Sequence, residues 1–186
     1  GASRSLYMDG NATIIAANKL LAAMRKEDGT LRTYDEMKAE GIETKYLGRY
    51  ETNTTPGLCR LDPNTGIGDP TPAFTYCLNL AEVEVDTKTG KTTVLKFTCV
   101  DFVGRIGNID AVNGQAYSGI MHGIGFALKE DYADVKKHAN MFGAGTSYIK
   151  DVPDDIDLIH IDGAISDGPF GSSGASEAFQ ASGHCA

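Results

Sequence analysis

The chain has 186 residues, 41% of them hydrophobic, which is enough for one domain with its own core and ordinary for a water-soluble protein. Its net charge of −8 argues against a nucleic-acid partner, because affinity for phosphate groups needs clustered lysine and arginine side chains. No stretch approaches the ~20 apolar residues of a membrane span, and no signal peptide is visible. We therefore expect residues 1–186 to form one domain of a cytoplasmic protein without nucleic-acid or membrane partners.

The first part of the sequence predicts two helices. Apolar residues recur at helical spacing over residues 11–26, and Asp9 or Asn11 can cap the first N–H groups of this helix. Thr33 and Glu36 have the spacing of a capping box, which predicts a short helix that starts after Thr33.

A strand is expected over residues 44–52, followed by an irregular, proline-rich stretch over residues 53–72. Irregular stretches of this length are uncommon inside compact domains. We interpret this one as a surface excursion that packs on another part of a larger protein, with plain disorder as the alternative.

The clearest pattern is a β-hairpin formed by residues 73–85 and 91–103. Apolar and polar residues alternate along both runs, and a turn sequence containing glycine separates them. Since side chains of a strand point alternately to its two faces, the pattern predicts that Leu95, Phe97 and Cys99 share one face of the sheet.

A glycine-rich helix is expected over residues 109–130, and a short strand over residues 156–161. Each glycine costs a helix roughly 1 kcal/mol relative to alanine, so the glycines indicate close approach of a ligand or of another backbone. Tight helix packing explains most of them, but Gln115 is a candidate ligand residue because an amide can both donate and accept. The fold class is therefore α+β, with a mixed sheet or hairpin and two main helices.

The cysteines and histidines give no sign of a metal site built from protein side chains. The cysteines form no C-x-x-C pair, and their spacing fits neither a zinc site nor a plant-type iron–sulfur cluster. The histidines share no ligand spacing either. We expect free or buried thiols, with Cys77 and Cys99 packed within the sheet, although the sequence leaves a disulfide open.

The sequence ends near a glycine-rich run, DGPFGSSGASE, over residues 167–177. Glycines let the backbone approach a ligand closely, and successive N–H groups can form an anion-binding nest. Glu177, at the end of this nest, is a candidate general base. The alternative, from composition alone, is a flexible tail with a solvated glutamate.

Three stretches in the right order resemble the molybdenum hydroxylases, the family of xanthine dehydrogenase and aldehyde oxidoreductase. The run DGPFGSSGASE resembles the loop with the family's catalytic glutamate, and NGQAYSGIMHGIG, over residues 113–125, resembles a helix beside the cofactor. The turn that resembles the family's cofactor-contacting "SRS" consists of Ala2, Ser3, Arg4 and Ser5. The resemblance runs over essentially the whole chain and is closest to the aldehyde oxidoreductase branch.

The resemblance implies the C-terminal portion of a molybdopterin-binding region in an enzyme that hydroxylates aldehydes or related heterocycles with oxygen from water. Glu177 is then the general base. Molybdenum is bound by molybdopterin, expected in a dinucleotide form, and not by protein side chains. The residues implied to contact the cofactor are Ala2, Ser3, Arg4, Ser5, Gln115, Gly174, Ala175 and Ser176.

The chain departs from the family in two respects. Ser176 stands where the family commonly has glycine, and serine is sterically harder to place if that position needs a positive φ. The family's iron–sulfur domains and the earlier half of its molybdenum region are absent from these residues. This predicts a fragment or split subunit that is inactive alone and whose partners supply those parts.

Two other functions compete with this interpretation. A non-catalytic interaction or assembly module would keep the fold without independent activity. A nucleotide-binding module is disfavoured, because no Walker or Rossmann pattern follows a strand at the required spacing.

Overall fold

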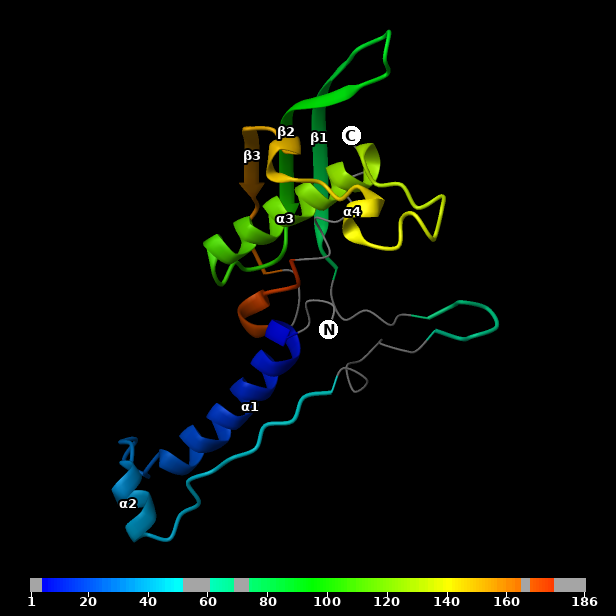
Figure 1. Ribbon diagram of the computed structural model, residues 1–186. Helices are drawn as coiled ribbons and strands as arrows, with labels where there is room; N and C mark the ends of the chain where they lie inside the picture. Colours follow the sequence, from blue (N-terminus) through cyan, green and yellow to red (C-terminus); the bar gives the residue numbers. More distant parts are fainter. Residues whose placement is uncertain (1–4, 52–60, 69–73, 165–167, 176–186) are drawn as a thin grey trace.

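The computed structural model describes residues 5–51, 61–68, 74–164 and 168–175 (Figure 1). Within these ranges the chain forms helices and a three-stranded mixed sheet, which confirms the predicted α+β class. None of the described helices has the length and apolarity to cross a membrane. The elements are α1 (Ser5–Met24), α2 (Tyr34–Ala39), β1 (Tyr76–Val85), β2 (Thr92–Phe102), α3 (Ile109–Leu128), α4 (Met141–Ala144) and β3 (Asp155–His160), with 3-10 turns η2 (Ile149–Asp151) and η3 (Pro169–Gly171).

The strands lie in the order β1-β2-β3, and α3 packs across one face of the sheet (Figure 1). β1 and β2 form the predicted antiparallel hairpin, whose turn contains Gly90 at a φ of +75°. β3 pairs with β2 in parallel. The hairpin, the helix over residues 109–130 and the last strand were therefore predictable from local pattern.

A β-bulge at Leu95 changes which side chains face the core. The register shifts between Glu82 and Val83, so Leu95 on the opposite strand has no partner. Leu95 is 53% exposed, whereas Val94 is 6% exposed. The prediction that Leu95 shares a face with Phe97 is therefore wrong, because the alternation of side chains does not continue through the bulge.

The core lies between α3 and the sheet. Phe97 and Cys99 from β2 and Ala116 and Ile120 from α3 are all fully buried in one hydrophobic cluster. Glycines 119 and 123 are buried on the same side of α3. The burial of these two glycines supports the expected close packing on this side of α3.

The first helix begins earlier than predicted. α1 already includes Ser5, so Asp9 and Asn11 lie inside the helix and do not cap it. The first turns of α1 pack on η3, where a Cβ on Gly10 would lie 2.4 Å from Cγ of Pro169. This contact joins segments far apart in the sequence, so the local capping pattern could not reveal it.

The strand expected over residues 44–52 does not form in its described part, which runs beside α1 without pairing to another strand. Lys19 Nζ donates to the carbonyl oxygen of Leu47 at 2.8 Å. A Cβ on Gly48 would lie 1.8 Å from the carbonyl oxygen of Ala12, so the two backbones are in close contact. The segment is therefore held by a helix and not by a sheet edge.

The capping box before α2 is confirmed. The Thr33 hydroxyl accepts from the N–H of Glu36 at 3.2 Å, and the Glu36 carboxylate accepts from the N–H of Thr33 at 2.7 Å. The hydrogen bond from the backbone N–H of Thr33 is the largest cause that lowers the pKa of Glu36 to about 2, and the bond from the Lys26 ammonium is the second. Of the expected irregular stretch, residues 61–68 are described and form an exposed turn.

Gly104→Ala should destabilise the protein. Gly104 has a φ of +80°, and a Cβ there would lie 2.5 Å from the carbonyl oxygen of Gly171. A left-handed backbone alone costs an L-residue about 1–2 kcal/mol, and the backbone contact adds to this. We expect the free energy of unfolding to fall by about 3 kcal/mol in a urea titration of the intact protein.

Gly114→Ala is the matched control for this variant. Nothing lies within 4 Å of a Cβ at this helical position. Since alanine is a better helix former, we expect a gain of about 0.5–1 kcal/mol. If Gly104→Ala were as stable as the unmodified protein, the close contact at the end of β2 would not exist.

Candidate functional site

The end of β2 and the loop after η3 are joined by hydrogen bonds. The N–H of Arg105 donates to the carbonyl oxygen of Gly171, and the N–H of Ser173 donates to that of Val103, both at 3.1 Å. The Ser172 hydroxyl donates to the carbonyl oxygen of Arg105 at 2.7 Å. Ser172 and Ser173 are buried, so this loop forms part of the packed structure.

The connection between β2 and α3, residues 103–108, also forms hydrogen bonds with a residue that follows β3. The Asp162 carboxylate accepts from the N–H of Ile106 and from the guanidinium of Arg105, each at 3.1 Å. The loop after η3 and Asp162, which follows β3, therefore both hold this connection in place.

These contacts shape a cavity of about 480 Å³ at the N-terminal end of α3. Its wall comes from four separate segments, which are the start of α1, the β2–α3 connection, the first turns of α3 and the loop after η3. The residues predicted to contact a cofactor that lie in this wall are Ser5, Gln115, Gly174 and Ala175. The predicted residues outside the described ranges are Ala2, Ser3, Arg4, Ser176 and Glu177.

The local structure of α3 explains where Gln115 lies. Asn108 caps the helix, because its side-chain oxygen accepts from the N–H of Ala111 at 2.9 Å. Val112 and Ala116 are buried against the sheet, whereas Gln115 is exposed and lines the cavity. Its amide is therefore available both to donate a hydrogen bond and to accept one.

The sequence did not single out the β2–α3 connection, although it supplies much of the wall. Val103, Arg105, Ile106, Gly107 and Asn108 all line the cavity. The sequence signal that could have pointed to this connection is the break between a predicted strand and a predicted helix. Such connections often carry functional residues because a rigid scaffold positions them.

A buried hydrogen-bond network beneath the first turns of α3 was not predicted from the sequence either. His160 Nδ1 lies 2.5 Å from Asp101 Oδ2, and its Nε2 lies 2.6 Å from Asn113 Oδ1. The side chains of His160 and Asp101 are 8% and 0% exposed. Both ring nitrogens of His160 therefore take part in short hydrogen bonds within this buried network.

This network connects β2, β3 and the first part of α3. Burial raises the pKa of Asp101, and the bond and charge of His160 oppose that rise. Asp101 Oδ1 is buried without a hydrogen-bond partner among the described residues. Asn113 precedes Gln115 by two residues, so the network fixes the part of α3 that faces the cavity. Only the pairing of β2 with β3 reveals it, because Asp101 and His160 are far apart in the sequence.

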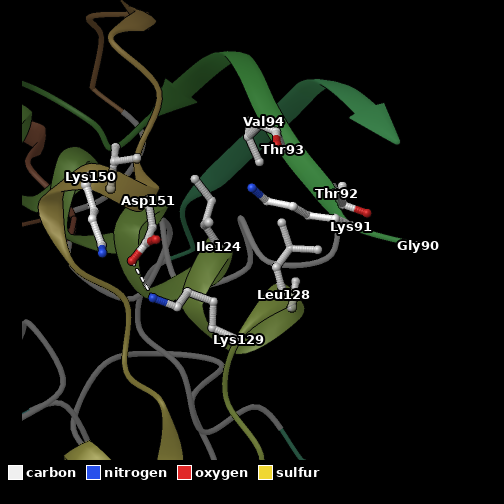
Figure 2. Close-up of a pocket in the computed structure, with 12 residues that line it drawn as sticks. Gly90, Lys91, Thr92, Thr93, Val94, Ile124, Leu128, Lys129, Lys150 and Asp151 are labelled. Atoms are coloured by element: carbon white, nitrogen blue, oxygen red, sulfur yellow. Dashed lines mark hydrogen bonds and ion pairs between the residues drawn. The ribbon is translucent and has the colours of Figure 1, made fainter. Parts of the chain in front are cut away.

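A second cavity, of about 490 Å³, lies at the C-terminal end of α3 (Figure 2). Lysines surround it, and one of them, Lys129, forms an ion pair with Asp151 at 2.5 Å that lowers the pKa of Asp151. None of the predicted cofactor-contacting residues that the structure describes lines this cavity. The first cavity is therefore the candidate site.

His160→Ala should destabilise the protein strongly, because it leaves the buried Asp101 carboxylate without its ion-pair partner. Removing one partner of a buried pair costs about 3–5 kcal/mol in the free energy of unfolding, which urea titration at neutral pH measures. Adding Asp101→Asn should recover part of the loss, because it removes the unpaired charge. A double variant no more stable than His160→Ala would contradict a charged pair.

Comparison with known proteins identifies the family. Residues 1–153 match the family described as "Molybdopterin cofactor-binding domain". The chain is 42% identical over 186 residues to an aldehyde oxidoreductase of Megalodesulfovibrio gigas, and 31% identical over 112 residues to a probable hypoxanthine oxidase, XdhD, of Escherichia coli K12. These alignments cover 100% and 58% of this chain but 20% and 12% of the relatives, so the chain spans at most about a fifth of their length.

Solved structures agree with the sequence matches. The aldehyde oxidoreductase from Desulfovibrio gigas matches 100% of this chain and 20% of its own, with a TM-score of 0.90 and 42% identity. Quinoline 2-oxidoreductase from Pseudomonas putida 86 matches 56% of this chain and 14% of its own, with a TM-score of 0.50 and 30% identity. The resemblance expected from the sequence is thereby confirmed, and the chain belongs to the molybdopterin cofactor-binding domain family of the molybdenum hydroxylases.

Proposed function

We propose that this chain forms part of the cofactor pocket of a molybdenum-dependent oxidoreductase that hydroxylates aldehydes, or related heterocycles, with oxygen from water. The main support is that Ser5, Gln115 and Ala175, which are far apart in the sequence, meet in the wall of one cavity. The match to aldehyde oxidoreductases over the whole chain supports the substrate class.

The cavity fits a molybdopterin group in size and in chemistry. Ligand cavities typically measure about 300–1,000 Å³, and this one measures about 480 Å³. Val103 and Ile106 provide apolar wall for a flat ring system, and the Gln115 amide can exchange hydrogen bonds with a pterin edge. A Cβ on Gly107 would meet nothing within 4 Å, so the wall borders open space there.

The work of the protein residues is to bind and orient the pterin and to exclude water. In this proposal the cofactor is held by Ala2, Ser3, Arg4, Ser5, Gln115, Gly174, Ala175 and Ser176. When bound, molybdopterin, which we expect in its dinucleotide form, supplies the redox chemistry through its molybdenum. Iron–sulfur clusters belong, in the same proposal, to domains outside this chain.

Glu177 is the proposed general base, which takes up the proton released as the oxygen of water is activated. It follows the wall residue Ala175 by two positions in the sequence. Ser176, in place of the family's glycine, favours the second candidate function, a non-catalytic assembly module that retains the fold.

Exposed apolar side chains on one face of the sheet support a partner region. Along β1, Tyr76, Leu78 and Leu80 are 63%, 65% and 56% exposed on the face opposite α3, and Ile159 on β3 is 50% exposed in the same row. Apolar patches of this kind mark interaction surfaces. We propose that the remaining half of the molybdenum-binding region, in the same polypeptide or in another subunit, packs on this face.

Glu177→Gln in the intact enzyme should lower kcat by about 10²–10⁴, because the amide keeps the shape of the side chain but cannot accept the proton. Turnover with a saturating aldehyde and molybdenum content should be measured on the same preparation. We expect the molybdenum content to stay at the level of the unmodified enzyme. A fully loaded Glu177→Gln enzyme with undiminished kcat would remove Glu177 from the mechanism.

Leu78→Lys tests the partner face in the protein purified from its own cells. Exposing a buried leucine costs about 1.5–3 kcal/mol, and a lysine adds the cost of burying a charge. We therefore expect a lower unfolding temperature and a lower molybdenum content. Ile149→Lys is the matched control, since Ile149 is 84% exposed on η2, and it should change neither. Identical behaviour of the two variants would argue against a covered face.

A further inference from the structure

The second cavity, at the C-terminal end of α3, has the size of a small-molecule site. It measures about 490 Å³, and ligand cavities typically measure about 300–1,000 Å³. Its wall comes from the β1–β2 turn with the start of β2, from the last turns of α3, and from η2. It shares no lining residue with the cavity proposed for the cofactor.

Three lysines from three separate elements give this cavity an excess of positive charge. Lys91 comes from the β1–β2 turn, Lys129 follows α3 and Lys150 lies in η2. Asp151 is the one carboxylate among the lining residues, so the wall carries a net charge of 3 − 1 = +2. The chain as a whole carries a net charge of −8, so this wall has the opposite sign.

Two of the three ammonium groups are left for a ligand. Lys129 Nζ donates to Asp151 Oδ2 at 2.5 Å and lies 5.0 Å from the centre of the Tyr148 ring. The bond from Lys129 is the largest cause that lowers the pKa of Asp151, and the charge of Lys150 contributes to the same shift. Within the described part of the chain, neither Lys91 nor Lys150 forms an ion pair of its own.

Apolar side chains form the floor between the lysines. Val94 and Ile124 line the cavity and are 6% and 1% exposed. In Figure 2, Lys91 extends from the hairpin on one side of Ile124, whereas Lys129 and Lys150 lie on the other side. The cavity therefore presents positive charge at two places with an apolar surface between them.

We propose that this cavity binds a small organic dianion of the aliphatic dicarboxylate class, in which a short apolar chain separates two carboxylate groups. One carboxylate pairs with Lys91 and the other with Lys150, and the apolar chain lies over Ile124. Because the two cavities have no residue in common, this site is independent of the proposed function.

The apolar floor favours a dicarboxylate over an inorganic anion. Each methylene group that is removed from water contributes about a fourfold gain in affinity, which phosphate lacks. The C-terminal end of a helix carries about half a negative charge and disfavours anions. The excess of two positive charges in the wall is larger than this, so a dianion is still attracted.

The test is isothermal titration calorimetry of the intact protein, purified from its own cells, with adipate at low ionic strength. We expect one adipate to bind per chain and the affinity to fall as sodium chloride is added. Hexanoate has a similar chain but one carboxylate, so we expect it to bind about fivefold more weakly, the factor of one charge pair in water. Inorganic phosphate should bind more weakly than adipate.

Lys91→Met removes the charge but keeps most of the aliphatic side chain, and it should weaken adipate binding by about fivefold. Lys88→Met is the matched control, because Lys88 is exposed in the same turn but does not line the cavity, and it should change nothing. Asp151→Asn should strengthen adipate binding by about fivefold, because it removes a repelling carboxylate. A damaged fold would not produce such a gain.

Three results would overturn the proposal. The first is the absence of adipate binding to the intact protein, as expected if another part of the enzyme covers this cavity. The second is equal adipate affinity of the Lys91→Met and Lys88→Met variants. The third is binding of hexanoate or phosphate as tight as that of adipate, because the site would then not recognise two carboxylates on an apolar chain.

Discussion

Hydrogen bonding between the loop after η3 and the end of β2 is the constraint on which the candidate site depends. Two glycines with positive φ, Gly104 and Gly171, make this close contact possible. A Cβ on Gly171 would lie 2.3 Å from Cβ of Ala164, and one on Gly104 would enter the backbone of the loop. Because the loop is held there, Ala175 lies in the same wall as Gln115, and the cavity combines the two ends of the described chain.

The position of α3 is the second requirement, and two kinds of interaction fix it. Packing of small side chains, such as Ala116, against Phe97 sets how closely the helix approaches the sheet. The buried hydrogen-bond network of Asp101, His160 and Asn113 fixes the end of the helix that faces the cavity. Apolar packing tolerates small shifts along the helix, whereas a buried network of short hydrogen bonds does not, because a buried polar group without its partner is costly.

The sequence predicted those parts of the fold that depend on local pattern, which are the hairpin, α3, the capping box before α2 and the existence of β3. It failed where distant contacts decide the outcome. The bulge moves Leu95 out of the core, and α1 starts at Ser5, in the part of the helix that packs on Pro169. For the site, the resemblance to the molybdenum hydroxylases selected Gln115 and the loop after η3, and both line the same cavity. His160 could not be selected, because its partner lies on a strand whose parallel pairing with β3 leaves no local signature.

A diffraction structure of the molybdenum-loaded protein, purified from its own cells and measured with anomalous scattering from molybdenum, tests the central claim most directly. The account predicts pterin density in the cavity between the start of α1, the first turns of α3 and the loop after η3. The Gln115 amide should then lie within hydrogen-bond distance of the pterin, about 3 Å. A loaded protein whose molybdenum and pterin lie away from this cavity would contradict the assignment of the site.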